Sequence, residues 1–223
     1  MNILLKYPSR GRPEKFKNTL KKHCEYLSYN HQYNFVFSFD DDDETMNNAG
    51  IQEDIKQILA NKNIQYEINY SQNKNKIEAI NNNLTNKQFD ILILLADDVI
   101  PILEKYDEII VNLFSNSPLL LDSTIHFYTA MWAHILDIWC VMGYDYYKRF
   151  EYIYHPSYKN IFSDNEYTEV SRLLNRTILS EESPFIHDWE SDKITAKNSE
   201  YSSSDWLAYD NRKQHNFFIT NQQ

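Results

Sequence analysis

The chain has 223 residues, enough for one large domain or two small ones, and its formal net charge is −10 at neutral pH. That charge argues against a protein that binds nucleic acid through a broad basic surface, although a local basic pocket for phosphate is compatible with it. Only three glycines occur, which excludes the Walker loop and the G-x-G-x-x-G turn, because both cradle phosphate with bare backbone. A phosphorylated ligand would have to be held by side chains and metal.

Strands and helices are expected to alternate over residues 1–100. Strands are predicted at 2–7, 34–39, 64–70 and 91–95. Helices are predicted between them, the first behind Pro13 and the next two from apolar residues at helical spacing over 51–59 and 77–84. A β-α-β-α-β-α-β order gives a right-handed, mostly parallel layered sheet flanked by helices, so the predicted class is α/β.

Residues 101–223 show a different pattern. Helices are predicted over 106–114, 165–174 and 199–216, and aromatic residues crowd the region up to Tyr158. Trp132 and Trp139 could stack on sugar faces, but large aromatics more often fill cores. Because no linker or repeat separates the two halves, residues 1–223 are expected to form a single domain.

Targeting signals are not evident. No stretch approaches the roughly 20 apolar residues that a transmembrane helix needs. The first eight residues, MNILLKYP, are too short and too polar for a signal peptide and read as a strand. Cys24 and Cys140 lie far apart without metal-ligand spacing, so reduced thiols and a cytoplasmic location are expected.

The central feature is the stretch from Phe89 to Pro101. Its five consecutive aliphatic residues, Ile91 to Leu95, predict a strand buried on both faces, which is typical of the centre of a parallel sheet. Asp97 and Asp98 follow at the carboxyl end, where ligands bind in open α/β sheets. Two adjacent acids cannot both be desolvated without a cation, which suggests a divalent metal or a ribose and phosphate ligand. The alternative is a pair that caps the next helix.

Other charged residues are expected at the same edge. Arg10 and Arg12 follow the first predicted strand, and the acidic run 40–44 follows the second. Only Asp40, nearest the strand end, is expected to point into this rim, and the other four acids to form a solvated loop. Carboxylates facing a guanidinium suit a ligand with a base, a ribose and a metal-bridged diphosphate.

Seven segments, in order along most of the chain, carry a resemblance to a known family. They are KYPSRGRP (6–13), FSFD (37–40), NKIEAIN (75–81), LADD (95–98), MG (142–143), YIYHPSY (152–158) and DNEY (164–167). With them the chain resembles family 2-type glycosyltransferases of the GT-A fold, a Rossmann-like layered sheet. The resemblance implies a nucleotide-sugar-binding half at 1–100 and an acceptor-binding half at 101–223.

The resemblance also implies roles for residues of the first half. Pro8, Ser9 and Arg10 would flank the nucleotide, and Asp40 would accept a hydrogen bond from the base, which is typically uracil. Lys76 would lie near the nucleotide pocket. The donor is therefore expected to be a nucleotide sugar, with a UDP-sugar favoured.

Five more acidic and basic residues would bind the metal and take part in the reaction. Asp97 would contact ribose or metal, and Asp98 would bind Mg²⁺ or Mn²⁺ bridging the two phosphates, with His187 as a late metal ligand. Asp164 or Glu166 would deprotonate the acceptor hydroxyl, and the other would cap a helix beginning near Tyr167. Asp164 is favoured as the base.

The expected reaction is metal-assisted, inverting transfer of a sugar to a hydroxyl of a glycan, lipid or protein. A cation stabilises the departing diphosphate, and one carboxylate acts as general base. One alternative is a Mg²⁺-dependent phosphotransferase or hydrolase on a doubly wound sheet, although its nucleophilic Asp would stand where Tyr7 to Arg10 stand. The other is a nucleotide-sugar or glycan-binding module without turnover.

Overall fold

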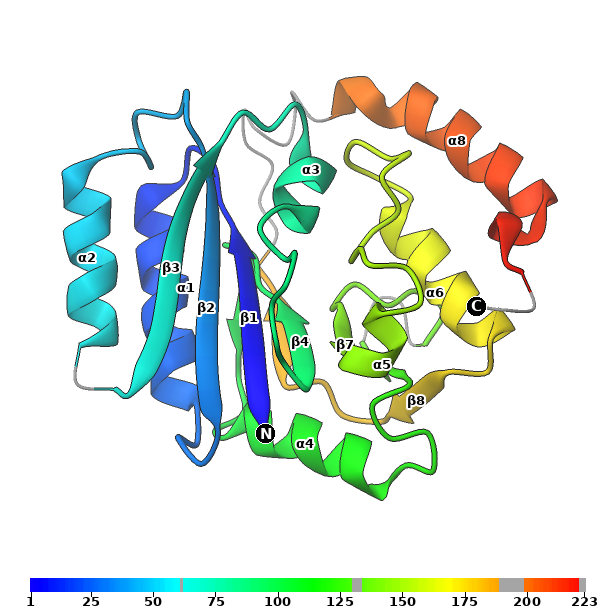
Figure 1. The fold of residues 1–223 in the computed structure, drawn as a ribbon, viewed down its shortest axis with the longest axis horizontal. Helices are drawn as coiled ribbons and strands as arrows, with labels where there is room; N and C mark the ends of the chain where they lie inside the picture. Colours follow the sequence, from blue (N-terminus) through cyan, green and yellow to red (C-terminus); the bar gives the residue numbers. More distant parts are fainter. Residues whose placement is uncertain (61, 130–133, 189–198, 221–223) are drawn as a thin grey trace.

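A computed structural model describes residues 1–60, 62–129, 134–188 and 199–220 (Figure 1). Seven strands form the main sheet in the order β3-β2-β1-β4-β7-β6-β8, and two more form a separate pair. The strands are β1 (Asn2–Pro8), β2 (Gln32–Asp40), β3 (Ile64–Ser71), β4 (Ile91–Leu94), β5 (Val99–Pro101), β6 (Thr124–Phe127), β7 (Val141–Gly143), β8 (Thr177–Ser180) and β9 (Phe185–His187). The helices are α1 (Pro13–Tyr26), α2 (Ala49–Leu59), α3 (Lys76–Asn81), α4 (Tyr106–Asn116), α5 (Tyr144–Tyr147), α6 (Ser163–Leu173) and α8 (Ser202–Gln214), with 3₁₀ turns at Ser199–Tyr201 and Asn216–Phe218.

The first half has the predicted parallel topology. β1 pairs in parallel with β2 on one side and β4 on the other, and β2 pairs in parallel with β3. β4 therefore lies in the middle of the seven strands, as its unbroken aliphatic run predicted. Its other neighbour, β7, is antiparallel, so the sheet is mixed beyond this point.

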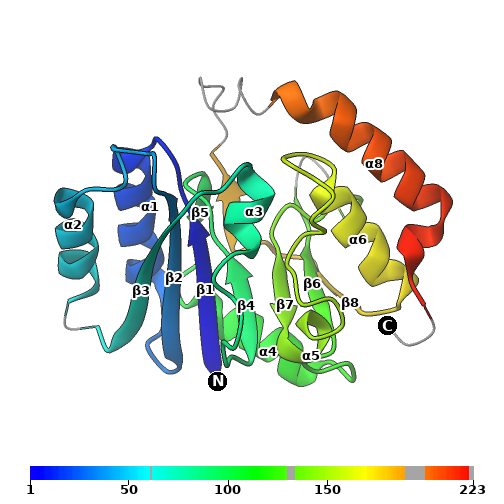
Figure 2. The ribbon, with the colours of Figure 1, turned by 45° about the horizontal axis from the view of Figure 1, so that its top comes forward.

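Alternate residues of the central strands enter two cores, one on each face of the sheet. In β4, Ile91 and Ile93 pack with apolar side chains of α1, α2 and α4, whereas Leu92 packs with those of α3, α5 and α6. A strand covered on both faces needs apolar residues at every position, which explains the absence of alternation. α8 packs beyond α6 as the outermost helix in both ribbon views (Figures 1 and 2).

Several helix boundaries differ from the sequence prediction. α6 begins at Ser163, two residues before the helix predicted over 165–174, because Phe162 adopts a left-handed conformation (φ 62°) directly before it. α3 ends at Asn81 instead of continuing to Leu84, and Asn83 is left-handed (φ 65°), a conformation that asparagine tolerates. The last predicted helix is divided into a 3₁₀ turn, α8 and a second 3₁₀ turn.

Five short strands, β5 to β9, were not predicted. Each has only three or four residues, so no alternating pattern can develop within it. In the described part of the chain, no helix combines the length and the apolar character needed to cross a bilayer.

Candidate functional site

The carboxyl ends of β1 and β2 bring basic and acidic side chains together, as predicted. Arg10, two residues beyond β1, donates a hydrogen bond to Asp40 at the end of β2. Its guanidinium also contacts both carboxylate oxygens of Asp42, at 2.6 and 3.0 Å. The second oxygen of Asp40 accepts a hydrogen bond of 2.6 Å from the side-chain amide of Asn73. Asp40 is buried and lies in the rim between these two donors.

The acidic run that follows β2 is not simply a solvated loop. Asp43 is buried, and its carboxylate accepts hydrogen bonds from the backbone N–H of Gly11 at 2.7 Å and from the Thr45 hydroxyl at 2.6 Å. Gly11 has a positive φ of 69°, which an L side chain rarely adopts. Asp43 therefore holds the turn that carries Arg10. The prediction that only Asp40 would face inward was wrong for Asp43.

Asp97 lies beside the end of β1. Its Oδ2 accepts a hydrogen bond of 2.9 Å from the Ser9 hydroxyl, and its backbone carbonyl accepts one of 2.8 Å from Thr19. Oδ1 is buried without a hydrogen-bond partner. Burial raises the pKa of Asp97 to about 7, although the hydrogen bond from Ser9 and the charge of Arg12 act in the opposite direction. A buried carboxylate oxygen without a donor is available to a ligand hydroxyl or a cation.

Asp98 is brought to His187 by the separate strand pair. β5 and β9 run antiparallel with Val99 opposite His187, and the backbone N–H of Asp188 donates to the Asp98 carbonyl at 2.8 Å. His187 Nε2 consequently lies 3.4 Å from Asp98 Oδ2. Burial would raise the pKa of Asp98, but the hydrogen bond and charge of His187, with the charge of Lys76, lower it overall. Asp98 is thus favoured as a carboxylate.

The two acids do not cap the next helix. α4 begins at Tyr106 and its N-cap residue is Lys105, well beyond β5. The helix-cap alternative for Asp97 and Asp98 is therefore wrong.

Asp164 lies in the first turn of α6 and faces the same charged region. Burial raises its pKa, and the charges of Lys76 and His187 oppose that shift. Lys76 is the first residue of α3, which lies beside the loop that leads into α6 (Figures 1 and 2). Lys76 itself is exposed.

Glu166 has different surroundings. It is buried and accepts two hydrogen bonds from Arg212, from Nε at 2.7 Å and from Nη2 at 2.8 Å. The hydroxyl of Tyr158 donates a third at 2.6 Å. These contacts join α6 to α8, and the structure does not bring Glu166 together with Asp98 and His187.

Two asparagines support the rim without having been predicted to do so. Asn81 at the end of α3 accepts hydrogen bonds from the backbone N–H groups of Ile153 at 2.9 Å and Tyr154 at 3.2 Å, and donates to the Tyr154 carbonyl at 2.6 Å. Asn81 thereby fixes the loop before α6 against α3. Asn73 orients Asp40, as described above. No local pattern marks either residue, because their partners come from distant parts of the chain.

The remaining candidates lie nearer the core. Pro8 is the last residue of β1 and is partly buried. Trp139 is 3% exposed and packs edge-on against the His187 ring, with 5.6 Å between ring centroids, so it belongs to the core as expected of a large aromatic. Trp132 lies outside the described residues.

Solved structures share this fold. The mannosyltransferase PcManGT from Pyrobaculum calidifontis, in complex with GDP-Man and Mn²⁺, matches 92% of this chain with a TM-score of 0.67 and 9% sequence identity. TarS from S. aureus, in complex with UDP-GlcNAc, matches 88% with a TM-score of 0.60 and 13% identity. The chain has a GT-A-like fold.

These matches extend over only part of the other proteins. The GT-A-like chain corresponds to 63% of the length of PcManGT and 61% of that of the TarS chain. No protein-family model matches it, and neither does any curated protein at the level of sequence.

Proposed function

We propose that this protein is a glycosyltransferase that moves a sugar from a nucleoside-diphosphate donor to a hydroxyl acceptor. The observation that carries the proposal is the position of Asp98 beside His187, at the same sheet edge as Asp97 and the Arg10–Asp40 pair. PcManGT and TarS, which have a similar fold, were solved with GDP-Man and UDP-GlcNAc respectively. The match to them supports the donor class.

The nucleotide would lie across the ends of β1 and β2. Asp40 would accept a hydrogen bond from the base, while Pro8, Ser9 and Arg10 flank the nucleotide. A carboxylate acceptor suits the N–H of uracil, so a UDP-sugar is the favoured donor. Lys76, exposed at the start of α3, would face the diphosphate, since its charge already acts on Asp98.

The residues present fit a divalent cation. Asp98 is favoured in its ionised form, His187 offers a ring nitrogen 3.4 Å from it, and Asp97 Oδ1 lacks a hydrogen-bond partner. Oxygen ligands with one imidazole suit Mn²⁺, and Mg²⁺ is the other candidate. Such a cation would stabilise the negative charge of the departing diphosphate.

Asp164 is the residue that we assign as general base in an inverting reaction. Its raised pKa, caused by burial, lies closer to neutrality than that of an exposed carboxyl, which favours proton abstraction from a hydroxyl. Glu166 is held by Arg212 and Tyr158, so its contribution would be to the stability of α6 against α8. Acceptors of this class are hydroxyls of a glycan, a lipid or a protein.

A panel of nucleotide sugars tests the proposal. The protein is incubated with UDP-, GDP- and CMP-sugars in Mn²⁺, Mg²⁺ or EDTA, and thermal stabilisation and donor hydrolysis are measured. We expect one nucleotide class to stabilise the protein, with slow metal-dependent hydrolysis of its sugar. Stabilisation without hydrolysis or transfer to any hydroxyl acceptor would indicate a non-catalytic binding module. Failure of every nucleotide to bind would overturn the proposal.

The thiols support a cytoplasmic location. Cys24 and Cys140 are both buried and free. Because reduced cysteines are typical of a reducing compartment, we place the reaction in the cytoplasm.

A further inference from the structure

A second group of candidate metal ligands lies at the opposite end of the sheet from the rim. His31 immediately precedes β2, whose other end carries Asp40, and β2 spans Gln32–Asp40. At about 3.3 Å per residue, roughly 26 Å of strand separates the two ends. Figure 1 shows α4, which supplies the other two members, at the end of the sheet where β1 begins. This group is therefore distinct from the rim.

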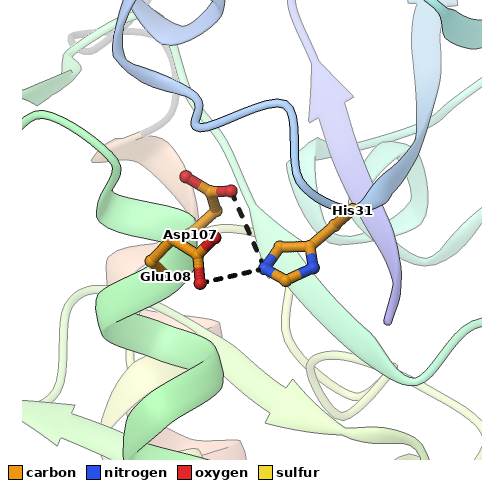
Figure 3. Close-up of side chains that lie close together, drawn as sticks. All are labelled: His31, Asp107 and Glu108. Carbon is orange, nitrogen blue, oxygen red and sulfur yellow. Dashed lines mark ion pairs between the residues drawn. The ribbon is translucent and has the colours of Figure 1, made fainter.

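The group consists of His31, Asp107 and Glu108, the last two from the first turn of α4. Each offers one ligand atom, and these atoms lie within 4.8 Å of one another. His31 Nε2 is 3.5 Å from Glu108 Oε2 and 4.0 Å from Asp107 Oδ2. In Figure 3 the ring nitrogen points at the two carboxylates. Ligands 2.0–2.2 Å from a tetrahedral Zn²⁺ are about 3.4 Å apart, so the three side chains would have to draw closer together to bind the ion.

The histidine nitrogen is the second indication of a ligand. Nε2 of His31 is buried and has no hydrogen-bond partner. The His31 side chain is 11% exposed and Asp107 is fully buried, whereas Glu108 remains 30% exposed and leaves an entry path from solvent. A buried nitrogen aimed at two carboxylates without a hydrogen bond is an arrangement that a cation between them would satisfy.

Neighbouring groups orient the carboxylates in the way that outer ligands of metal sites do. Asp107 Oδ2, the oxygen that faces His31, accepts hydrogen bonds from the Ser28 hydroxyl at 2.5 Å and the Tyr33 hydroxyl at 2.6 Å, and Oδ1 accepts one of 2.9 Å from the Ser28 backbone N–H. Glu108 Oε1 accepts one of 2.7 Å from the Asn30 side chain, which leaves Oε2 facing His31. Such contacts fix ligand geometry and raise affinity.

We propose that His31, Asp107 and Glu108 form a Zn²⁺ site that joins the loop before β2 to the start of α4. Imidazole nitrogen and carboxylate oxygen are both ligands of Zn²⁺, and a water would supply the fourth ligand. The two carboxylates and the ion balance in charge, which relieves the repulsion between two acids placed so close together. The site is structural, and its loss leaves the chemistry at the opposite end of the sheet unchanged.

The test uses full-length Asp98→Asn protein stripped of metal, because this background removes the proposed ligand at the rim. ZnCl₂ is titrated by calorimetry and by thermal shift, and CoCl₂ is used to record visible absorption. We expect one Zn²⁺ per chain, a higher melting temperature, and the intense visible band of tetrahedral Co²⁺. No Zn²⁺ binding in this background would overturn the site and leave a simple histidine–carboxylate ion pair.

Two further variants in the same background assign the ligands. His31→Gln and Glu108→Gln should each weaken Zn²⁺ binding at least about tenfold and abolish the Co²⁺ band. His215→Gln, which removes an exposed histidine after α8, is the matched control and should bind Zn²⁺ unchanged. Equal affinity in all three variants would overturn the assignment. Circular dichroism of each variant confirms that folding is retained. Glu108→Gln, at a partly exposed position, is the variant that should disturb folding least.

Discussion

His187 Nε2 lies 3.4 Å from Asp98 Oδ2, although the two residues are far apart in the chain. The pairing of β5 with β9 produces this proximity, because Val99 lies opposite His187 in the ladder. Backbone hydrogen bonds, and not the two side chains alone, therefore hold the pair in place. This strand pair would pre-organise the proposed metal site, which lowers the cost of binding an ion.

The first prediction concerns this pair. Asp98→Asn and His187→Gln should each weaken UDP binding in Mn²⁺ by about tenfold or more, because each removes one proposed ligand of the bridging ion. In EDTA, both variants and the wild type should bind UDP with equal, weaker affinity. Calorimetry in the two buffers makes the comparison.

Asp188→Asn is the control for this prediction. Asp188 is adjacent to His187 but pairs with Lys15, so its removal should keep the Mn²⁺ effect. Equal UDP affinity of the wild type with and without metal would contradict the metal bridge.

The second prediction separates the two acids of α6. Asp164→Asn should bind donor normally but lower the transfer rate by about 10²–10⁴-fold, the usual cost of removing a general base. Glu166→Gln should transfer nearly as the wild type but melt at a lower temperature, because it weakens a buried ion pair with Arg212. Single-turnover transfer assays and thermal melts measure the two effects. Exchanged phenotypes would mean exchanged roles.

The third prediction concerns the turn after β1. Asp43→Ala should lower the free energy of unfolding by about 1–3 kcal/mol, because it leaves the Gly11 N–H and the Thr45 hydroxyl without their acceptor. Asp41→Ala, at an exposed neighbouring position, should change it by less than about 0.5 kcal/mol. Urea unfolding followed by fluorescence compares the two. A neutral Asp43→Ala would show that the turn does not depend on this carboxylate.

The fourth prediction is a dependence of stability on pH. Burial lowers the pKa of His23 to about 4, while a hydrogen bond to the Val99 carbonyl acts in the opposite direction. The unfolded chain takes up this proton below about pH 6.5 and the folded protein only near pH 4, so stability is lost as the pH falls through this range. Between pH 7.5 and pH 5.0 His23 should cost about 2 kcal/mol.

A variant isolates this contribution from other titrating groups. His23→Gln should lose less stability than the wild type between the two pH values, by about the same 2 kcal/mol. Urea unfolding of both proteins at pH 7.5 and 5.0 gives the stability that each loses between the two pH values. Parallel losses in the two proteins would show that His23 is not the group responsible.

Much of the first half could be predicted from local sequence. The five aliphatic residues Ile91 to Leu95 predicted a central buried strand, because a strand covered on both faces has no polar side chains. Parallel strands end at one edge, so the same reasoning placed Arg10, Asp40 and Asp97 near one another, and hydrogen bonds in the rim confirm this.

The tertiary structure decided the contacts between distant segments. β5 and β9 are too short to show a pattern, and their pairing depends on the whole sheet placing them side by side. Asp43 looked like one of several solvated acids until the Gly11 turn folded onto it. Asp164 and Glu166 share one helical turn and the same chemistry, and only the approach of α8, which carries Arg212 to Glu166, distinguishes them. Sequence alone determines which residues are charged and which strands are buried, because those depend on local composition and periodicity. The partner of each charge depends on packing between segments far apart in the chain, and that is decided only when the fold is complete.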